Sequence, residues 1–141
     1  MAVVHETYDF DVPVERLYEW FSVHENLSSL FGIDVERIKA GDTEPNGVGS
    51  VRKLSVKGMM PFEETVTEAI PNERIEYRVT KGTPLRNHLG VQVFSSTGDG
   101  RSHLDYTITF DAAVPGLAKV VAAGLSRSIR RGFPKAARAL S

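Results

Sequence analysis

Residues 102–140 read SHLDYTITFDAAVPGLAKVVAAGLSRSIRRGFPKAARAL, a clean strand pattern followed by the longest helical pattern of the chain. Apolar and polar side chains alternate over 102–110, which is typical of a strand with one buried face. From about Pro115 to Leu140, apolar side chains recur at helical spacing, but many of them are only Ala, Gly or Val. Because such a helix cannot fill the space beneath a curved sheet, we expect a cavity that takes a small molecule.

The segments before this stretch are mostly strand-like and are separated by turn residues. Strands are expected at 3–10, 33–40, 51–57, 62–70, 74–80, 85–95 and 102–110. Between the first two strands, helical spacing predicts one helix over 14–23 and a shorter one over about 25–31 that stops at Gly32. Asp11 is the expected N-cap of the first helix, because its side chain can accept hydrogen bonds from the backbone of the first turn.

The composition indicates a single globular domain over residues 1–141, since 41% of the residues are hydrophobic and 25% are charged. No apolar run approaches the ~18 residues of a membrane span, so no integral membrane association is expected. The N-terminus lacks the pattern of a signal peptide, and we expect a cytoplasmic protein. The chain has no cysteine, which excludes disulfides, thiolate nucleophiles and cysteine-ligated zinc.

The formal net charge of −1 is unevenly distributed. Residues 112–141 hold six cations and no acid, whereas the rest of the chain holds 11 basic and 18 acidic residues. The six cations are Lys119, Arg127, Arg130, Arg131, Lys135 and Arg138. One interpretation is a basic helix that lies on an acidic body, with its cations near the helix C-terminus, where the helix dipole favours positive charge. The other is a surface patch that binds anionic lipid or a partner protein. Six charges interspersed with alanines fall short of a nucleic-acid footprint, so no nucleic acid partner is expected.

Four segments together resemble a known superfamily. They are VPVERLY (12–18), GVGSVR (47–52), ETVTEAIPNERIEY (64–77) and GDGRSHLDY (98–106). In order and spacing they resemble the START-like, helix-grip (SRPBCC) superfamily, and within it the bacterial polyketide cyclase/dehydrase-like proteins. The resemblance implies an α+β fold in which a seven-stranded, curved antiparallel sheet surrounds a long C-terminal helix, with two short helices after the first strand and a deep apolar cavity. It does not imply one function, because relatives include lipid and sterol carriers, hormone receptors, cyclases and quinone-binding chaperones.

Strand alternation places several polar side chains on the same faces as apolar ones. Arg52 and Glu64 lie on sequential strands and are expected to pair, because an unpaired buried charge is expensive. Together with Tyr77, Asn87 and Tyr106 they are expected to point into the cavity. The complete ligand-binding set predicted here is Arg52, Leu54, Glu64, Val66, Tyr77, Asn87, Leu89, Val91, Tyr106, Ile108, Leu117, Val121 and Leu125.

Other types of site find little support in the sequence. The four histidines show no metal-binding spacing, so neither a metal nor a cofactor is expected. His88 alternates with Leu89 and is expected to face outward. The chain has no G-x-S-x-G motif, so a hydrolase triad is unsupported. The segments 59–62 and 81–90 either flank the mouth of the cavity or shield a hairpin tip.

Several functions remain open at this point. The leading expectation is a module that binds a hydrophobic small molecule, such as a lipid, a polyketide-like aromatic or an isoprenoid. The alternative is an enzyme of the polyketide cyclase, aromatase or dehydratase type, in which Glu64 acts as general acid/base. A third is docking through the basic helix, and a purely structural ion pair of Arg52 with Glu64 also explains the polar residues. The sequence leaves open whether the protein is an enzyme and whether it forms a homodimer.

Overall fold

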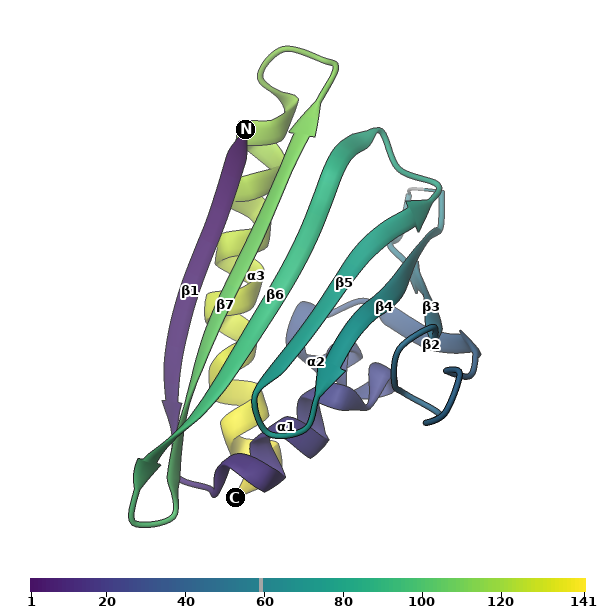
Figure 1. Cartoon of the computed structure of the whole chain (residues 1–141). Coiled ribbons are helices and arrows are strands. Elements are labelled where there is room, and N and C mark those ends of the chain that lie inside the picture. The colour runs from purple at the N-terminus through teal and green to yellow at the C-terminus, as the bar shows by residue number, and fades with distance from the viewer. Residues whose placement is uncertain (59) are drawn as a thin grey trace.

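An antiparallel sheet of seven strands curves around one long helix in the computed structural model of the chain (Figure 1), which describes residues 1–58 and 60–141. In sheet order the strands are β1 (Ala2–Phe10), β7 (Arg101–Ala112), β6 (Leu85–Gly98), β5 (Arg74–Lys81), β4 (Phe62–Ile70), β3 (Val51–Ser55) and β2 (Asp34–Lys39). The connection from β1 to β2 holds α1 (Val14–Ser22), the 3-10 turn η1 (His24–Asn26) and α2 (Leu27–Phe31), and α3 (Leu117–Leu140) follows β7. The predicted α+β helix-grip fold is confirmed. Met59, which belongs to the segment expected either to flank the mouth of the cavity or to shield a hairpin tip, lies outside the described residues.

The C-terminal half of α3 is packed into an aromatic core. Phe133 lies against Tyr8 and Phe10 of β1, with ring centroids 5.3 and 6.2 Å away, and Phe10 in turn meets Phe21 of α1 at 6.1 Å. Gly132 of α3 faces α2, and a Cβ at this position would overlap the carbonyl oxygen of Leu30. Helices α2 and α3 therefore approach each other more closely than any side chain would allow.

The N-terminal half of α3 is less well covered. Leu117, Val121 and Leu125 continue the apolar stripe of the helix, yet they are only half-buried, whereas Ile129 and Phe133 are fully buried. The helix packs mainly against β1 and α2 rather than against the central strands of the sheet. The two ends of the molecule thus differ, with a tight aromatic core at one and half-buried aliphatic side chains at the other.

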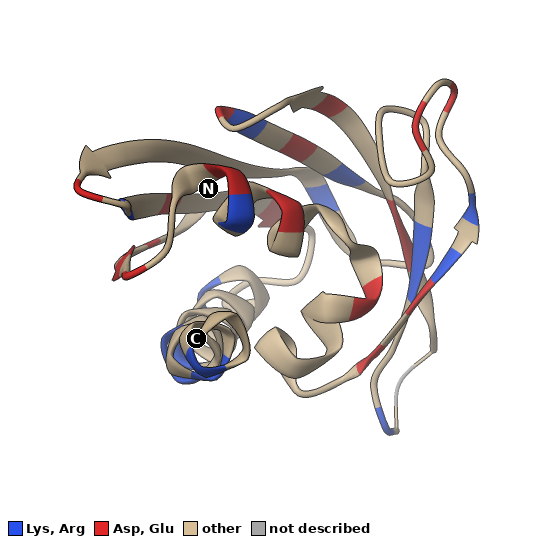
Figure 2. Cartoon of the chain, turned by 90° about the horizontal axis from the view of Figure 1, so that it is seen from below, with Lys and Arg blue, Asp and Glu red and all other residues tan. Residues whose placement is uncertain are grey.

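The charges follow the division predicted from the sequence, since Lys and Arg residues gather along α3, whereas the acidic residues all lie on the rest of the chain (Figure 2). Among the described residues, Arg130 is the α3 cation that forms an ion pair, with Glu6 of β1 at 3.4 Å. Glu6 also accepts a hydrogen bond from Ser126, so its carboxylate ties the middle of α3 to β1. None of the helices in the described part combines the length and hydropathy needed to cross a bilayer.

The N-cap predicted at Asp11 is wrong. The cap position of α1 is Pro13, whose ψ of 153° is extended, and no side chain caps the helix. Asp11 lies two residues earlier in the connection and forms an ion pair with Arg101 Nε at 2.9 Å. The carboxylate therefore lies beside the end of the β6–β7 hairpin and does not cap the helix.

Candidate functional site

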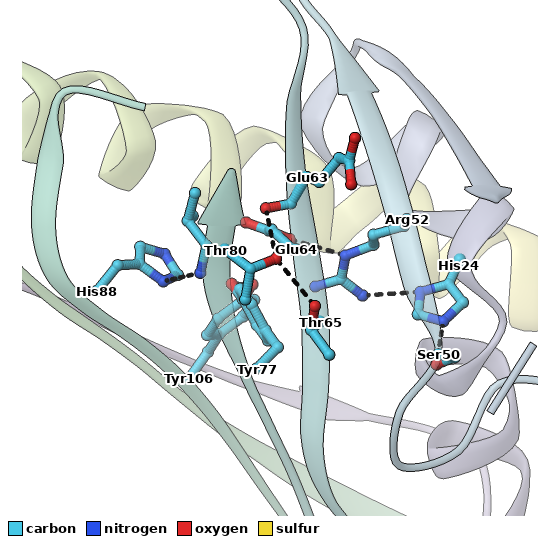
Figure 3. Close-up of polar contacts among 11 residues, drawn as sticks. His24, Ser50, Arg52, Glu63, Glu64, Thr65, Tyr77, Thr80, His88 and Tyr106 are labelled. Atoms are coloured by element: carbon cyan, nitrogen blue, oxygen red, sulfur yellow. Dashed lines mark hydrogen bonds and ion pairs between the residues drawn. The ribbon is translucent and has the colours of Figure 1, made fainter. Parts of the chain in front are cut away.

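A cluster of polar side chains lies on the concave face of the sheet, centred on Arg52 of β3 (Figure 3). Arg52 stands directly opposite Glu64 of β4 in the antiparallel register. Its Nε donates a hydrogen bond to Glu64 Oε1 at 2.7 Å, and the Arg52 side chain is only 3% exposed. The pairing predicted from the sequence is confirmed. Burial is the largest single effect on the pKa of Arg52 and lowers it, but Glu64, Tyr77 and Tyr106 together outweigh burial, so this pKa is raised.

His24 extends the cluster toward η1. Arg52 Nη1 lies 3.1 Å from His24 Nδ1, and His24 Nε2 lies 2.8 Å from the hydroxyl of Ser50. A guanidinium can only donate, so Nδ1 accepts and the proton of the neutral ring sits on Nε2, which donates to Ser50. Burial, followed by the positive charge of Arg52, lowers the pKa of His24 to about 4. This tautomer is the reverse of a catalytic serine–histidine pair, because the ring has no nitrogen free to take the serine proton.

Two tyrosines form the floor of the site. Tyr77 of β5 and Tyr106 of β7 are fully buried, and their hydroxyl groups hydrogen-bond to each other. Burial raises the pKa of both phenols, so they stay neutral at physiological pH. The Arg52 guanidinium lies over the Tyr77 ring, 4.4 Å from its centroid, in a cation–π arrangement. Gly90 of β6 stands opposite Tyr77 and makes room for this ring, because a Cβ there would overlap it.

The guanidinium of Arg52 is incompletely satisfied. Its Nε and Nη1 have partners, but Nη2 is buried and has no hydrogen-bond partner among the described residues. Buried polar atoms in native proteins are nearly always hydrogen-bonded, so such an atom calls for an explanation. The nitrogen points away from His24, toward the side of the cluster that holds the two tyrosines (Figure 3).

The inward orientation predicted for Asn87, Leu89 and Val91 is wrong. The buried face of β6 carries His88, Gly90, Gln92 and Phe94, which alternate with the predicted residues. Asn87 is exposed, adopts a positive φ of 53° and donates a hydrogen bond to Asp111 at 3.4 Å. The pairing of β6 with β7 is irregular between Arg86 and Leu89. Beyond this point, Leu89 and Val91 stand opposite Thr109 and Thr107 on the outer face of the sheet.

The outward orientation predicted for His88 is wrong for the same reason. Its ring stacks on Phe110 with centroids 6.5 Å apart, and its Nδ1 accepts a hydrogen bond from the backbone N–H of Val79 at 3.1 Å. Burial is the main cause of its lowered pKa. His88 therefore belongs to the inner face, beside Tyr77.

The remaining residues of the predicted set lie on the concave side. Those buried on the sheet beside Arg52 and Glu64 are Leu54, Val66, Tyr77, Tyr106 and Ile108, and those half-buried on α3 are Leu117, Val121 and Leu125. Sequence reasoning missed His24, Ser50 and Gln92, which are buried with them. Ser50 could have been found because it precedes Arg52 by two residues and so shares its face. His24 follows a helix without any periodic signal.

One end of the concave face carries a rim of half-buried apolar side chains. On the sheet they are Phe62 at the start of β4, Val79 near the end of β5 and Leu85 at the start of β6. These strand ends lie at the same end of the sheet as the N-terminal half of α3 (Figure 1). Within the polar cluster, Glu64 and His88 keep the most exposure, at 7% each, and they lie next to this rim. The cluster is therefore closest to solvent at the apolar rim.

Two surface hollows lie elsewhere, around α2, β2 and β3. One, of about 410 Å³, is lined by Glu25, Ser28, Asp34, Val35, Glu36, Lys53 and Ser55. The other, of about 570 Å³, is lined by Ser28, Ser29, Gly32, Ile33, Asp34, Ser55, Val56 and Lys57. Neither borders Arg52 or lies between the sheet and α3, where the sequence predicts the cavity. The described residues also contain no group of His, Asp or Glu side chains able to hold a metal ion.

Comparison with known proteins gives a family and a fold. The family model described as polyketide cyclase / dehydrase and lipid transport matches residues 1–141. No curated protein matches the chain. A START superfamily protein from Mycobacterium smegmatis is similar in structure, with a TM-score of 0.79 at 14% identity over 100% of both chains.

Two further structures are similar. The Aha1 dimer from Colwellia psychrerythraea has a TM-score of 0.71 at 14% identity, covering 99% of this chain and 96% of that one. A norcoclaurine synthase point mutant from Thalictrum flavum, in complex with a transition-state analogue, has a TM-score of 0.69 at 16% identity, covering 96% and 92%. At such identities the likeness demonstrates a common fold.

Proposed function

The chain belongs to the polyketide cyclase/dehydrase and lipid transport family, and on that premise we propose that residues 1–141 form one START-like domain that binds a hydrophobic small molecule. The ligand enters between the sheet and the N-terminal half of α3. It is an apolar molecule of the size of a lipid chain, a polyketide-like aromatic or an isoprenoid. Its polar group reaches the cluster around Arg52, while its apolar body contacts the rim.

The apolar rim carries this proposal. Phe62, Val79 and Leu85 on the sheet face the same end of the molecule as Leu117 and Val121 on the helix, and all five are half-buried. Apolar side chains that are partly exposed from two facing elements are typical of the entrance to a ligand site. A ligand that buries about 300 Å² of apolar surface there gains about 7 kcal/mol before the costs of association are subtracted.

The test is a titration with the neutral fluorescent probe N-phenylnaphthylamine. The wild-type chain is expected to bind one probe per chain in a saturable manner. Val121→Asp places a charge at the rim and is expected to weaken binding at least tenfold, because the carboxylate would have to be desolvated beside the probe. Val120→Asp is the matched control, since Val120 neighbours Val121 but is 71% exposed on the outer side of α3. No saturable binding, or equal weakening by both variants, would contradict the proposal.

A second candidate is an enzyme of the cyclase, aromatase or dehydratase type. It is favoured by Glu64, a carboxylate that keeps some exposure toward the rim, beside an Arg52 N–H that can polarise a carbonyl. Incubation with a naphthyl β-hydroxyketone tests it, because loss of an α-proton and of hydroxide gives an absorbing enone and water. An enzyme forms the enone, and Glu64→Gln, whose amide oxygen can still accept a hydrogen bond from Arg52, abolishes this although the variant still binds N-phenylnaphthylamine. A binding module forms no enone with either chain.

A further inference from the structure

The nitrogen atoms of the Arg52 guanidinium have different partners. Nε is taken by Glu64 and Nη1 by His24, and the planar face of the guanidinium rests on Tyr77. These three contacts hold the group in one orientation, and Nη2 remains with two N–H donors and no partner in the described chain. The site therefore presents a fixed, buried donor whose acceptor does not come from the described residues.

The charges around this donor decide what kind of acceptor fits. Arg52 and Glu64 are oppositely charged, buried and in contact, so they balance each other. His24 adds no charge at neutral pH because its pKa is lowered to about 4, and both tyrosines are neutral. A ligand carboxylate would leave one uncompensated negative charge beside Glu64 in buried surroundings, which is strongly unfavourable. A neutral oxygen acceptor adds no charge.

We propose that Arg52 Nη2 binds the neutral carbonyl oxygen of an apolar ligand, such as that of a ketone, quinone or ester. A carbonyl oxygen has two lone pairs and no hydrogen, so it accepts from Nη2 without bringing a donor that needs a further partner. This inference rests on the proposed function and deepens it by naming the polar group of the ligand. The donor is charged, so the bond is of the stronger, charge-assisted kind.

Three probes of similar size separate the carbonyl from the alternatives. Acetylnaphthalene carries a neutral carbonyl, ethylnaphthalene carries no acceptor and naphthoate carries a carboxylate. Their dissociation constants are measured at pH 7.5 by displacement of N-phenylnaphthylamine from the wild-type chain. Acetylnaphthalene is expected to bind roughly tenfold more tightly than ethylnaphthalene, and naphthoate more weakly than acetylnaphthalene.

A substitution then assigns the preference to Arg52. Arg52→Lys keeps the positive charge beside Glu64 but removes the third nitrogen of the fork, so the preference for acetylnaphthalene is expected to disappear while ethylnaphthalene still binds. Lys53→Met is the matched control, because Lys53 is the next residue of β3 and is exposed on the opposite face. The Lys53→Met variant is expected to prefer acetylnaphthalene over ethylnaphthalene to the same extent as the wild type.

A spectroscopic readout keeps the inference testable if Arg52→Lys does not fold. The carbonyl stretch of acetylnaphthalene, labelled with ¹³C, is recorded by difference infrared spectroscopy on the wild-type chain. A shift to lower frequency relative to the probe in hexane is expected, because a charge-assisted hydrogen bond weakens the C=O bond. An unshifted band would overturn the inference, as would a water molecule that keeps Nη2 occupied when the probe is bound.

The outcomes of the three-probe titration distinguish this inference from the proposed function. If all three probes bind equally, a hydrophobic site exists but the carbonyl assignment is wrong. If naphthoate binds best, the ligand is an anion and the charge argument fails. If none of them binds and N-phenylnaphthylamine does not bind either, the proposed function itself is overturned.

Discussion

Arg52 combines three kinds of contact in one side chain, and its removal should show how strongly they depend on each other. Arg52→Met leaves the Glu64 carboxylate buried without its partner, so we predict a loss of roughly 3–5 kcal/mol in the free energy of unfolding. The double variant Arg52→Met/Glu64→Leu removes both charges and is expected to recover most of that loss. Urea unfolding of both variants and of Glu64→Leu completes the cycle, and strictly additive effects would contradict a direct pairing.

The lowered pKa of His24 leads us to predict that the stability of the folded chain depends on pH. Its pKa is lowered to about 4 in the folded chain and is near 6.5 when unfolded, so between these values the unfolded state binds more protons. Stability is therefore expected to fall by up to about 3 kcal/mol as the pH drops from 6.5 to 4. The charges of Arg52 and Arg37 act in this direction, whereas Glu25 opposes it.

The comparison with His24→Gln isolates this contribution from that of His88 and of the acidic residues. Unfolding free energies of the two chains are measured by urea titration at intervals between pH 4 and pH 7. The variant is expected to lose less stability than the wild type over this range, because its amide does not titrate. The same slope in both chains would mean that folding does not lower the pKa of His24.

At the residue scale, the sequence predicted the site in part. Arg52 and Glu64 could be paired in advance because both occur within clean alternation on neighbouring strands. The error on β6 arose because its apolar residues Leu89 and Val91 face outward, while its inner face carries His88, Gly90 and Gln92. Counting back from the hairpin would have corrected it, since Leu104 stands opposite Phe94 and Tyr106 opposite Gln92. The polar side chains on the inner face of β6 belong to the cluster around Arg52.

At the element scale, the packing of α3 on α2 depends on Gly132. Gly132→Ala would push a methyl group into the Leu30 carbonyl, so a loss of about 1–3 kcal/mol in unfolding free energy is predicted. Gly124→Ala in the same helix is the matched control, because a Cβ there meets nothing within 4 Å. It is expected to stabilise the chain by up to about 1 kcal/mol through helix propensity.

Thermal and urea unfolding of the two alanine variants, side by side, check this prediction. The difference between them reports the close approach of the helices, because both share the gain in helix propensity. Equal stability of the two variants would show that α2 moves away from α3 without loss.

The elements themselves could be predicted because each is bounded by clear signals. The stop at Gly32 is one example, since this glycine adopts the left-handed conformation with φ of 69°. The cap of α1 could not be predicted from residue type alone, because α1 begins after Pro13, two residues beyond Asp11, and no side chain caps it. The bulge at Asn87 carried no sequence signal strong enough to reset the alternation of β6.

At the scale of the whole molecule, the two ends of α3 divide the protein into a packed half and an accessible half. Phe133 anchors the C-terminal half against the aromatic rings of β1, whereas Val121 and Leu125 leave the N-terminal half partly uncovered. The difference follows from what covers the helix, because α2 packs on the C-terminal half, where Gly132 meets Leu30.

The most direct test of the account is a methyl NMR titration of the Ile-, Leu- and Val-labelled chain with N-phenylnaphthylamine. We predict that the largest shifts occur at the rim, at Val79, Leu85, Leu117 and Val121. Val56 and Ile33, which line the hollow near α2, should stay unchanged. Shifts confined to Val56 and Ile33, or no shifts at all, would contradict a binding site between the sheet and α3.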